Sequence, residues 1–583
     1  MSKTKSEIAP SVPTDRPTSE LHTFAWTLDR MIHSNIARRT GGLSPIALGQ
    51  VWWDWAAHLA ASPGRQMELA VSAGKKAAAL ARDVTKGDLA VDDVRYRDPA
   101  WRAWPFNVLA AAHKTQEDWW SEVTTGLPGV SAAHERVATF AARQLLDMAA
   151  PANSILTNPE VQRETFREGG QNLVRGMQHL REDVLHTATG QRPAGMEDFV
   201  VGKTLATTPG KVVFRNHLIE LIQYAPTTAK VRPEPILIVP AWIMKYYVLD
   251  LSPANSLIGW LVGQGFTVFC ISWRNPDPED RDLGMNDYRE QGVMAALDVI
   301  GKIVPGAKVH ATGYCLGGTL LSIAAAAMGR DGDDRLASLG LLAAQVDFTE
   351  VGELGLFIND SQLALLEDMM WRQGVLKAEQ MSGTFQMLKS NDLIWSRMVR
   401  EYMLGKRGEP NDLMAWNADT TRMPYRMHSE YLRKLYLNND LAEGRLVVQG
   451  RAVALTDIKA PVFAVGAERD HVAPWKSVYK IQRLSDVDVT FALTGGGHNG
   501  GIVSEPGHPH RHFRIHTSRH GEAYVGADHW AEVAEPHDGS WWTAWGAWLA
   551  ERSGTPVPPP AMGAAKAGLK PLCDAPGDYV HQE

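Results

Sequence analysis

Two patterns of apolar residues divide the chain near residue 200. From Leu21 to Glu197, apolar side chains recur at three- and four-residue spacing, most clearly in Pro63–Asp83 and Ala132–Met148, and this spacing is typical of amphipathic helices. The stretch before it, residues 1–20, is polar and contains several prolines, so we expect a disordered lead. The pattern therefore predicts an all-helical N-terminal domain over residues 21–197.

Beyond residue 200, short runs of Val, Ile, Leu and Phe are separated by stretches of helical length. Lys211–Tyr224 predicts two short strands joined by an Arg-Asn-His turn. Further strands are predicted at Ile236–Val239, Phe266–Trp273, Val309–Thr312, Leu339–Ala343, Val462–Val465 and Val489–Leu493. Buried strands that alternate with helices indicate a mostly parallel sheet covered on both faces, and hence an α/β fold.

The strand pattern is interrupted between about residues 347 and 457. That segment is helical in periodicity and rich in Trp and Tyr. We predict that it is a helical cap inserted above the carboxyl ends of the strands, where sheets of this kind bind their ligands. Residues 198–583 then form one catalytic domain around the insertion. The Pro/Ala/Gly-rich tail after Gly554 is expected to be extended and exposed.

Composition and charge exclude several classes of function. The 583 residues carry 59 Lys and Arg against 66 Asp and Glu, a net charge of −7. No nucleic-acid partner is expected, because sequence-independent binding needs a basic surface. Three cysteines exclude a disulfide scaffold. We find neither a signal-peptide core nor 18 consecutive apolar residues, so we predict a cytoplasmic protein without a membrane span.

The strongest chemical signal is the sequence GYCLGG at residues 313–318. It lies between a predicted strand and a predicted helix, which is the setting of a nucleophile elbow. A thiolate at Cys315 would be favoured by the helix N-terminus and by a neighbouring imidazole. The alternative is a small buried cysteine in a glycine-rich turn, and the strand–turn–helix setting favours catalysis over it.

A catalytic triad on such a sheet needs an acid and then a histidine further along the chain. Asp470 follows the predicted strand Val462–Val465, and His498 follows Val489–Leu493 within a glycine-rich loop. Because both come directly after strand ends, they can converge on Cys315. Asp470 alone could equally be a helix cap or a turn residue. The ordered set, however, predicts a nucleophile, an orienting acid and a general base.

The loop after Ile236–Val239 lies where an oxyanion hole would be completed. One backbone N–H would come from Leu316, directly after the nucleophile, and we predict Ile243 in this loop as the other donor. Met244, the next residue, could equally line an apolar pocket, and the two functions are compatible.

A histidine-rich tract from His508 to His520 is a competing candidate site. Such tracts can bind metals, but this one lacks the Cys pair and the regular ligand spacing of zinc sites. We therefore predict a surface loop, with no metal and no cofactor.

Together these residues resemble the polyhydroxyalkanoate (poly-3-hydroxybutyrate) synthases, particularly the long single-subunit type, over about residues 90–580. Beyond the GYCLGG box, the resemblance rests on motifs in the family's order: PAN at 151–153 with TNPE at 157–160, KYYVLDL at 245–251, SWRNPD at 272–277, NDLIW at 391–395, WN at 416–417, DH at 470–471, GH at 497–498, and GSWW at 539–542 followed by Trp545 and Trp548. The commoner family form has Asn in place of Met244, so only a backbone role carries over at that position.

The resemblance implies an α/β-hydrolase core with a mobile helical cap, preceded by a helical domain. It implies an acyltransferase that polymerises (R)-3-hydroxyacyl-CoA, with 3-hydroxybutyryl-CoA the expected unit, and releases CoA. Cys315 would carry the acyl chain as a thioester, with His498 as base and Asp470 as third member. A homodimer, no metal, and association with the polyester granule surface are also implied. We further assign Met244, Tyr247 and Trp416 to substrate binding.

Two other functions fit parts of the same sequence. A thioesterase or a polyester depolymerase would use the same triad, with water in place of a hydroxyl group. A non-enzymatic granule-coating protein would not need the ordered triad. The twenty tryptophans bear on the granule surface, because eight of them fall in residues 21–197, where exposed aromatic rings could hold an apolar polymer. Those at 541–548 are expected to pack in the core.

Overall fold

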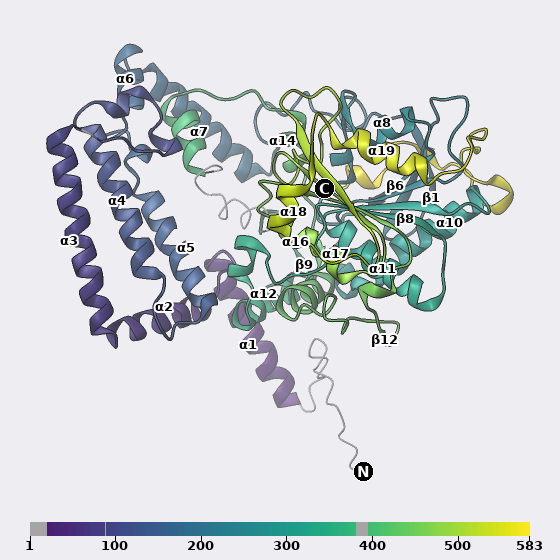
Figure 1. Cartoon of the computed structure of the whole chain (residues 1–583), viewed down its shortest axis with the longest axis horizontal. Helices are drawn as coiled ribbons and strands as arrows, with labels where there is room; N and C mark the ends of the chain where they lie inside the picture. The colour runs from purple at the N-terminus through teal and green to yellow at the C-terminus, as the bar shows by residue number, and fades with distance from the viewer. Residues whose placement is uncertain (1–19, 88, 381–393) are drawn as a thin grey trace, which may run out of the picture. The chain divides into compact units, whose positions relative to one another are not determined.

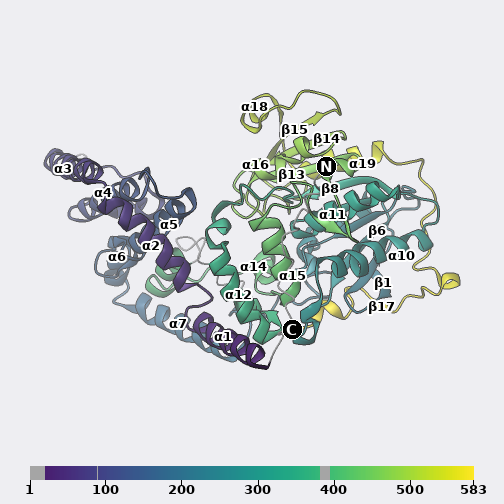
Figure 2. The same ribbon diagram turned by 90° about the horizontal axis from the view of Figure 1, so that it is seen from below.

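The computed structural model describes residues 20–87, 89–380 and 394–583. Contacts within the chain divide it into two compact units. Among the described residues, the helical unit comprises 43–87, 89–197 and 394–410, and the sheet unit comprises 20–42, 198–380 and 411–583. Figures 1 and 2 show the helices of the first and the large sheet of the second. The predicted disordered lead lies outside the described residues except for its last position.

Helices form the framework of the helical unit, as the apolar spacing predicts. They are α2 (Pro45–Ala60), α3 (Pro63–Lys86), α4 (Phe106–Thr124), α5 (Ala132–Met148), α6 (Pro159–Arg167), α7 (Gln171–Thr189) and the π-helix η9 (Met398–Met403). Capping residues begin several of them. The Ser44 hydroxyl accepts the N–H of Ala47 at the start of α2, and Asn158 accepts two backbone N–H groups of α6. The TNPE motif therefore contains a helix cap.

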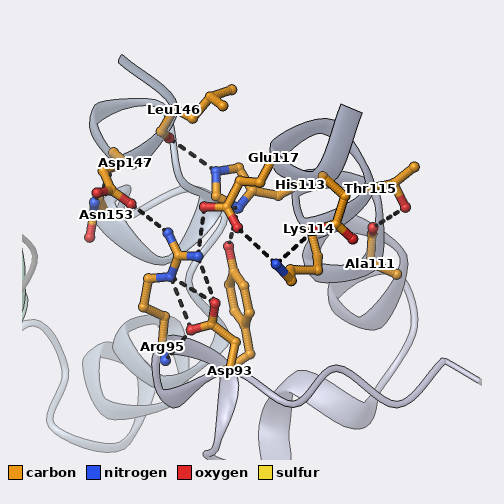
Figure 3. Close-up of polar contacts among 12 residues, drawn as sticks. Asp93, Arg95, Ala111, His113, Lys114, Thr115, Glu117, Leu146, Asp147 and Asn153 are labelled. Atoms are coloured by element: carbon orange, nitrogen blue, oxygen red, sulfur yellow. Dashed lines mark hydrogen bonds and ion pairs between the residues drawn. The ribbon is translucent and has the colours of Figure 1, made fainter. Parts of the chain in front are cut away.

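A buried ion network joins the short 3₁₀ turn η1 (Val94–Tyr96) to α4 and α5 (Figure 3). The guanidinium of Arg95 contacts the carboxylates of Asp93 at 2.6 Å, Glu117 at 2.7 Å and Asp147 at 2.8 Å. The side-chain amide of Asn153, in the PAN motif, donates to the Asp147 carbonyl at 2.7 Å. This motif therefore stabilises the end of α5.

Arg95→Met is expected to destabilise the helical unit by about 3–5 kcal/mol, because three partly buried carboxylates would lose their cation. The matched control is Arg163→Met, since Arg163 is 53% exposed in its pair with Asp98 and should contribute less than about 1 kcal/mol. Hydrogen–deuterium exchange in peptides from α4 and α5 measures both effects. Unchanged protection in Arg95→Met would show that the network does not stabilise the unit.

Helix α1 (Glu20–Arg39) does not belong to the unit in which we predicted it. We expected it in the helical domain, but it packs in the sheet unit against α12 (Asp360–Gln373). Arg30 pairs with Asp368 at 3.0 Å, and the rings of Trp26 and Trp371 meet edge-on with centroids 5.5 Å apart. Amphipathic spacing predicts a helix but not the surface that covers it. The helical unit therefore begins at residue 43 instead of 21.

The segment around η9 belongs to the helical unit, although we predicted it in the cap. It lies within the predicted cap insertion, but it packs against α7 in the helical unit. Asn172 donates to the carbonyl of Met403 at 2.8 Å, and Asp183 forms ion pairs with Arg397 at 2.9 Å and Arg407 at 2.8 Å. The predicted insertion thus contributes residues to both units.

An eleven-stranded sheet forms the core of the sheet unit, in the order β16-β15-β14-β13-β8-β7-β3-β6-β2-β1-β17. Its strands are β1 (Gly210–Arg215), β2 (Ile219–Tyr224), β3 (Ile236–Val239), β6 (Val268–Trp273), β7 (Val309–Tyr314), β8 (Leu336–Leu342), β13 (Val462–Ala467), β14 (Val489–Thr494), β15 (His512–Ser518), β16 (Glu535–Asp538) and β17 (Cys573–Asp574). The strands from β6 through β14 in this order pair in parallel, and the outer ones are antiparallel. The predicted strands and the mostly parallel sheet are confirmed.

Helices cover both faces of the sheet. Helices α8 (Leu257–Gly263) and α19 (Trp541–Glu551) lie on one face, and α10 (Ala295–Ile303) and α11 (Leu316–Asp331) lie on the other (Figure 1). Trp541, Trp542 and Trp545 of α19 are at most 1% exposed, which confirms that they belong to the core. None of the described helices is both long and apolar enough to cross a membrane.

Smaller elements complete the sheet unit. Apart from short 3₁₀ turns, the helical ones are α9 (Met285–Asp287), the π-helix η6 (Tyr288–Met294), α14 (Asp412–Asn417), α15 (Tyr425–Glu430), the π-helix η10 (Tyr431–Leu437), α16 (Trp475–Tyr479), α17 (Ile481–Leu484) and α18 (Ala527–Val533). Three pairs of short strands lie outside the large sheet: β4 (Asp250–Ser252) with β5 (Asn255–Ser256), β9 (Val375–Leu376) with β10 (Met423–Pro424), and β11 (Val447–Val448) with β12 (Arg451–Ala452). Helices therefore dominate the described part of the insertion, as predicted.

Two segments that we predicted to be irregular are strands. Part of the histidine-rich tract forms β15, in which Phe513–Ser518 pair with β14. The tail after Gly554 is not simply extended and exposed, because Val557 exchanges two backbone hydrogen bonds with Val231 at 2.8 Å and β17 pairs with β1. Both segments lie near the sheet edges and are half exposed, so their sequences lack the apolar run that marks a buried strand.

Candidate active site

Cys315 lies at the turn between β7 and α11. Its backbone angles are φ 52° and ψ −124°, a strained combination for a residue with a side chain. Its N–H donates to the carbonyl of Leu342 at 2.8 Å, which anchors the turn to the end of β8. The predicted strand–turn–helix setting of the GYCLGG sequence is confirmed, and the strained turn lifts the thiol above the end of the strand.

Close backbone contacts explain the glycines of this turn. A Cβ atom on Gly313 would lie 2.3 Å from the Cα of Gly318, and one on Gly317 would lie 2.1 Å from the carbonyl oxygen of Val239. No side chain fits at either position without moving the backbone. Because Val239 ends β3, the second contact brings the loop after β3 next to Cys315.

His498 and Asp470 meet beside the thiol. Nδ1 of His498 donates to Oδ2 of Asp470 at 2.7 Å, and the other carboxylate oxygen accepts the N–H groups of Val472 and Ala473, each at 2.8 Å. The Asp470 side chain is fully buried and that of His498 is 11% exposed. A negative charge on Cys315 also acts on this imidazole and favours its protonated form. The three residues predicted as a triad therefore lie together, and their catalytic roles remain predictions.

The surroundings of His498 favour its charged form. Burial opposes the charge, but the Asp470 carboxylate and the Cys315 thiolate outweigh burial and raise the pKa of His498 to about 10. The ion pair therefore stabilises the folded site fully below about pH 6.5, the usual pKa of histidine, and is lost as the pH rises through about 10. Near neutral pH the imidazole is therefore protonated, and a cation beside a cysteine is a setting that activates thiols as nucleophiles.

The loop after β3 is fixed by the cap. Met244 forms an antiparallel bridge with Thr420, and the Thr421 hydroxyl donates to the carbonyl of Trp242 at 3.2 Å. Leu316 occupies the first position of α11, where backbone N–H groups have no partner within the helix. The assignment of the Leu316 and Ile243 N–H groups to an oxyanion hole remains a prediction.

The predicted substrate-binding residues have different environments. Tyr247 is fully buried, and its hydroxyl donates to Asp419 at 2.8 Å. Trp416 is 4% exposed, and its indole N–H donates to the carbonyl of Lys245 at 2.8 Å. These two side chains hold the loop after β3 against α14, and their assignment to substrate binding stays a prediction. Met244 is half-buried and remains a candidate for the pocket wall.

Aromatic residues of the cap approach the thiol, and sequence analysis did not assign them to the site. Burial raises the pKa values of the Tyr431 and Tyr436 hydroxyls, and the charge of a Cys315 thiolate adds to both shifts. The Tyr431 ring lies 6.0 Å from that of Trp242 and 5.2 Å from that of Tyr436. Both tyrosines belong to the π-helix η10, and π-helical turns are frequent at functional sites. Their only signal in the sequence is the aromatic enrichment of the insertion.

The histidine-rich tract gains no support as a metal site. Among the described residues, only Glu220, Cys573 and Asp578 bring three possible ligand atoms together. The guanidinium of Arg215 already occupies that cluster, because its Nη2 contacts both carboxylates and lies 3.8 Å from the Cys573 sulfur. A positive charge is thus supplied there by the chain itself.

Three sequence families match the chain. Residues 23–65 match the family described as poly-beta-hydroxybutyrate polymerase N terminal, residues 92–261 match poly-beta-hydroxybutyrate polymerase (PhaC) N-terminus, and residues 234–504 match the alpha/beta hydrolase fold. The last match contains β3, the Cys315 turn, Asp470 and His498. Together with the sheet order, it shows that the sheet unit has an α/β-hydrolase fold.

Curated relatives match over most of their length. A poly(3-hydroxyalkanoate) polymerase of Methylorubrum extorquens is 42% identical over 84% of this chain and 81% of its own. The poly(3-hydroxyalkanoate) polymerase subunit PhaC of Cupriavidus necator is 34% identical over 84% and 83%, and poly(3-hydroxyalkanoate) polymerase 2 of Ectopseudomonas oleovorans is 33% identical over 84% and 86%. With both its N-terminal segments and its hydrolase core matched in this way, the chain belongs to the poly(3-hydroxyalkanoate) polymerase family.

Proposed function

We propose that this protein polymerises (R)-3-hydroxyacyl-CoA, with 3-hydroxybutyryl-CoA as the expected unit, into a polyester with release of CoA, and that the acyl chain is held as a thioester on Cys315. Membership of the polymerase family supports the overall reaction. The observation that carries the mechanism is the hydrogen bond of 2.7 Å between His498 and Asp470, together with the strained turn that presents Cys315 at the end of β7.

The loading step uses the ion pair. The Cys315 thiolate attacks the carbonyl carbon of the acyl-CoA thioester, and backbone N–H groups near Leu316 stabilise the oxyanion that forms. The bond between that carbon and the CoA sulfur then breaks. The His498 imidazolium gives its proton to the departing sulfur, which leaves CoA as a thiol, Cys315 as an acyl thioester and His498 neutral.

The elongation step restores the ion pair. A 3-hydroxyl group attacks the thioester on Cys315, and neutral His498 takes the hydroxyl proton. The new ester bond forms as the bond to sulfur breaks, so the Cys315 thiolate and the His498 imidazolium are regenerated. Asp470 stabilises the imidazolium and keeps the imidazole in the tautomer that has its proton on Nδ1. We therefore expect Asp470 to matter more for elongation than for loading.

A hydrolase with the same parts would use water in place of the hydroxyl group. The buried rings of Tyr431 and Trp242, 7% and 2% exposed and 6.0 Å apart, support the polymerase because they join the cap to the loop after β3 through an apolar contact. The deciding experiment incubates purified protein with 3-hydroxybutyryl-CoA and follows both CoA release and product size. Polymer with stoichiometric CoA is expected, whereas CoA release with only free 3-hydroxybutyrate would indicate a thioesterase and overturn the proposal.

We also propose that the protein associates with the polyester granule through its helical unit. Large apolar side chains are exposed there, including Trp52 at 65%, Trp53 at 75% and Trp104 at 78%. Exposed aromatic residues of this size favour contact with an apolar phase. Formation of a homodimer is also expected from the family resemblance, and sedimentation with and without substrate tests it.

Replacing Trp52, Trp53 and Trp104 by glutamine is expected to lower the granule-bound fraction several-fold, measured by fractionation of polymer-producing cells. Deleting the N-terminal domain is a weaker experiment, because α7 and η9 form part of one unit and deletion would expose η9. The matched control replaces Val447 and Leu572, exposed apolar residues of the sheet unit, by glutamine. An equal loss in both variants would argue against a specific role of the helical unit.

A further inference from the structure

We propose that Tyr314 and Asn499 form a positioning pair that holds the imidazole of His498 in line with the thiol of Cys315. Each residue is the chain neighbour of a catalytic candidate: Tyr314 precedes Cys315, and Asn499 follows His498. The inference concerns the thiol–imidazole pair, and it bears on polymerisation only through the proposed function of that pair.

A hydrogen bond joins the two residues across the sheet. The Tyr314 hydroxyl donates to Oδ1 of Asn499 at 2.5 Å, and Tyr314 is 2% exposed. Tyr314 ends β7 and Asn499 follows β14, and strands β8 and β13 lie between β7 and β14 in the sheet. The bond therefore ties the nucleophile's strand directly to the loop of the histidine. A buried hydroxyl that lost this acceptor would be destabilised, so the bond resists movement of the loop.

The ring of Tyr314 supports the imidazole itself. The ring centroids of Tyr314 and His498 are 5.6 Å apart, and their planes differ by 35°. Asp470 fixes Nδ1, and the tyrosine ring packs against the imidazole, which limits rotation of His498. An aromatic ring in this position also favours a cation. Glycines occupy 495–497 and 500–501, so the loop has few side chains of its own with which to hold the histidine.

The groups around His498 allow the effect of its orientation to be measured separately from the effect of the charges in the site. The titratable groups that contact it are Asp470, Cys315 and Tyr314. Burial raises the pKa of the Tyr314 hydroxyl well above its usual value, and the negative charges of Cys315 and Asp470 add to this, so the hydroxyl stays a donor at neutral pH. Asn499 does not titrate. Loss of the pair should therefore change the alignment of His498 without removing a charge from the site.

Tyr314→Phe tests the pair because it keeps the ring and removes the hydroxyl. The readout is the rate at which iodoacetamide alkylates Cys315 as a function of pH. We expect about a tenfold lower rate near pH 7, where the thiolate depends on an aligned imidazolium. Above about pH 10, where the thiolate forms without that support, the rate should match wild type. The control Tyr479→Phe removes another tyrosine hydroxyl, which donates to Val525 at 2.8 Å, and should leave the profile unchanged.

Asn499→Leu provides the second arm, because it removes the acceptor and keeps a side chain of similar size. It should reproduce the loss seen in Tyr314→Phe, and the double variant should lose no more than either single variant. A wild-type pH profile in Tyr314→Phe, an equal drop at all pH values, or additive losses in the double variant would each overturn the positioning pair. If the profile shifts but wild-type protein makes no polymer, the pair stands and the proposed function fails.

Discussion

Cys315→Ala is expected to lower polymer formation from 3-hydroxybutyryl-CoA by at least about 10³-fold, which corresponds to about 4 kcal/mol of transition-state stabilisation. The reason is that the variant has no atom to carry the acyl chain: His498 and Asp470 remain, but neither can form the thioester. Initial rates of CoA release, together with product size, measure the effect. Cys315→Ser should retain a small residual rate, because a hydroxyl is far harder to ionise beside the same imidazole.

Cys573→Ala is the matched control for this experiment. Cys573 is a free, half-buried cysteine in β17, on the opposite edge of the sheet from the strands that carry Asp470 and His498. Its loss should leave the rate of CoA release unchanged. Activity retained in Cys315→Ala would exclude covalent catalysis at this thiol.

Asp470→Asn is expected to lower steady-state polymerisation by about 10²–10⁴-fold. The amide removes the charge that raises the pKa of His498 to about 10, so the imidazolium becomes weaker and the imidazole less firmly oriented. Loading should suffer less than elongation, because the thiol still forms some thiolate whereas an alcohol needs a base. A rapid burst of CoA release followed by slow turnover is therefore expected. Equal losses in the burst rate and in the steady-state rate would contradict a larger role of Asp470 in elongation than in loading.

Glu468→Gln is the matched control for Asp470→Asn. Glu468 lies two residues away, is about one-third exposed and pairs with His512 at 3.2 Å. Removing its charge should change the rate by less than twofold, since exposed ion pairs contribute little.

The central strands and the nucleophile turn could be predicted from sequence because burial on both faces produces continuous apolar runs. The run Val309–Thr312 is an example of such a strand. The nucleophile turn was indicated by the glycines of residues 313–318, and the other two triad candidates by their positions directly after β13 and β14. Strand β15, the second from one edge of the sheet, was missed for the same reason, since His512–Ser518 is largely exposed or half-buried and has no such run. The partner of α1 was missed because the spacing of its apolar residues does not specify whether α12 or the helical unit covers it.

The supporting residues of the site could not be predicted from sequence. The contact of Tyr314 with Asn499 joins residues 185 positions apart, and only the sheet order brings them together. The approach of Tyr431 to Cys315 depends on a π-helical turn, for which the sequence has no distinctive pattern. Tyr247 and Trp416 were assigned to substrate binding, but their polar atoms are hydrogen bonded within the protein. Sequence motifs thus identified the reactive groups, whereas the hydrogen bonds that position them could be identified only from the structure.

The acyl thioester on Cys315 is the central claim, and mass spectrometry tests it most directly. Protein mixed briefly with 3-hydroxybutyryl-CoA is quenched in acid, digested and analysed for the peptide that contains Cys315. We expect this peptide to gain one or more 3-hydroxybutyryl units, and hydroxylamine to remove them. Polymer formation without any adduct on Cys315, or with the adduct on another residue, would contradict the mechanism.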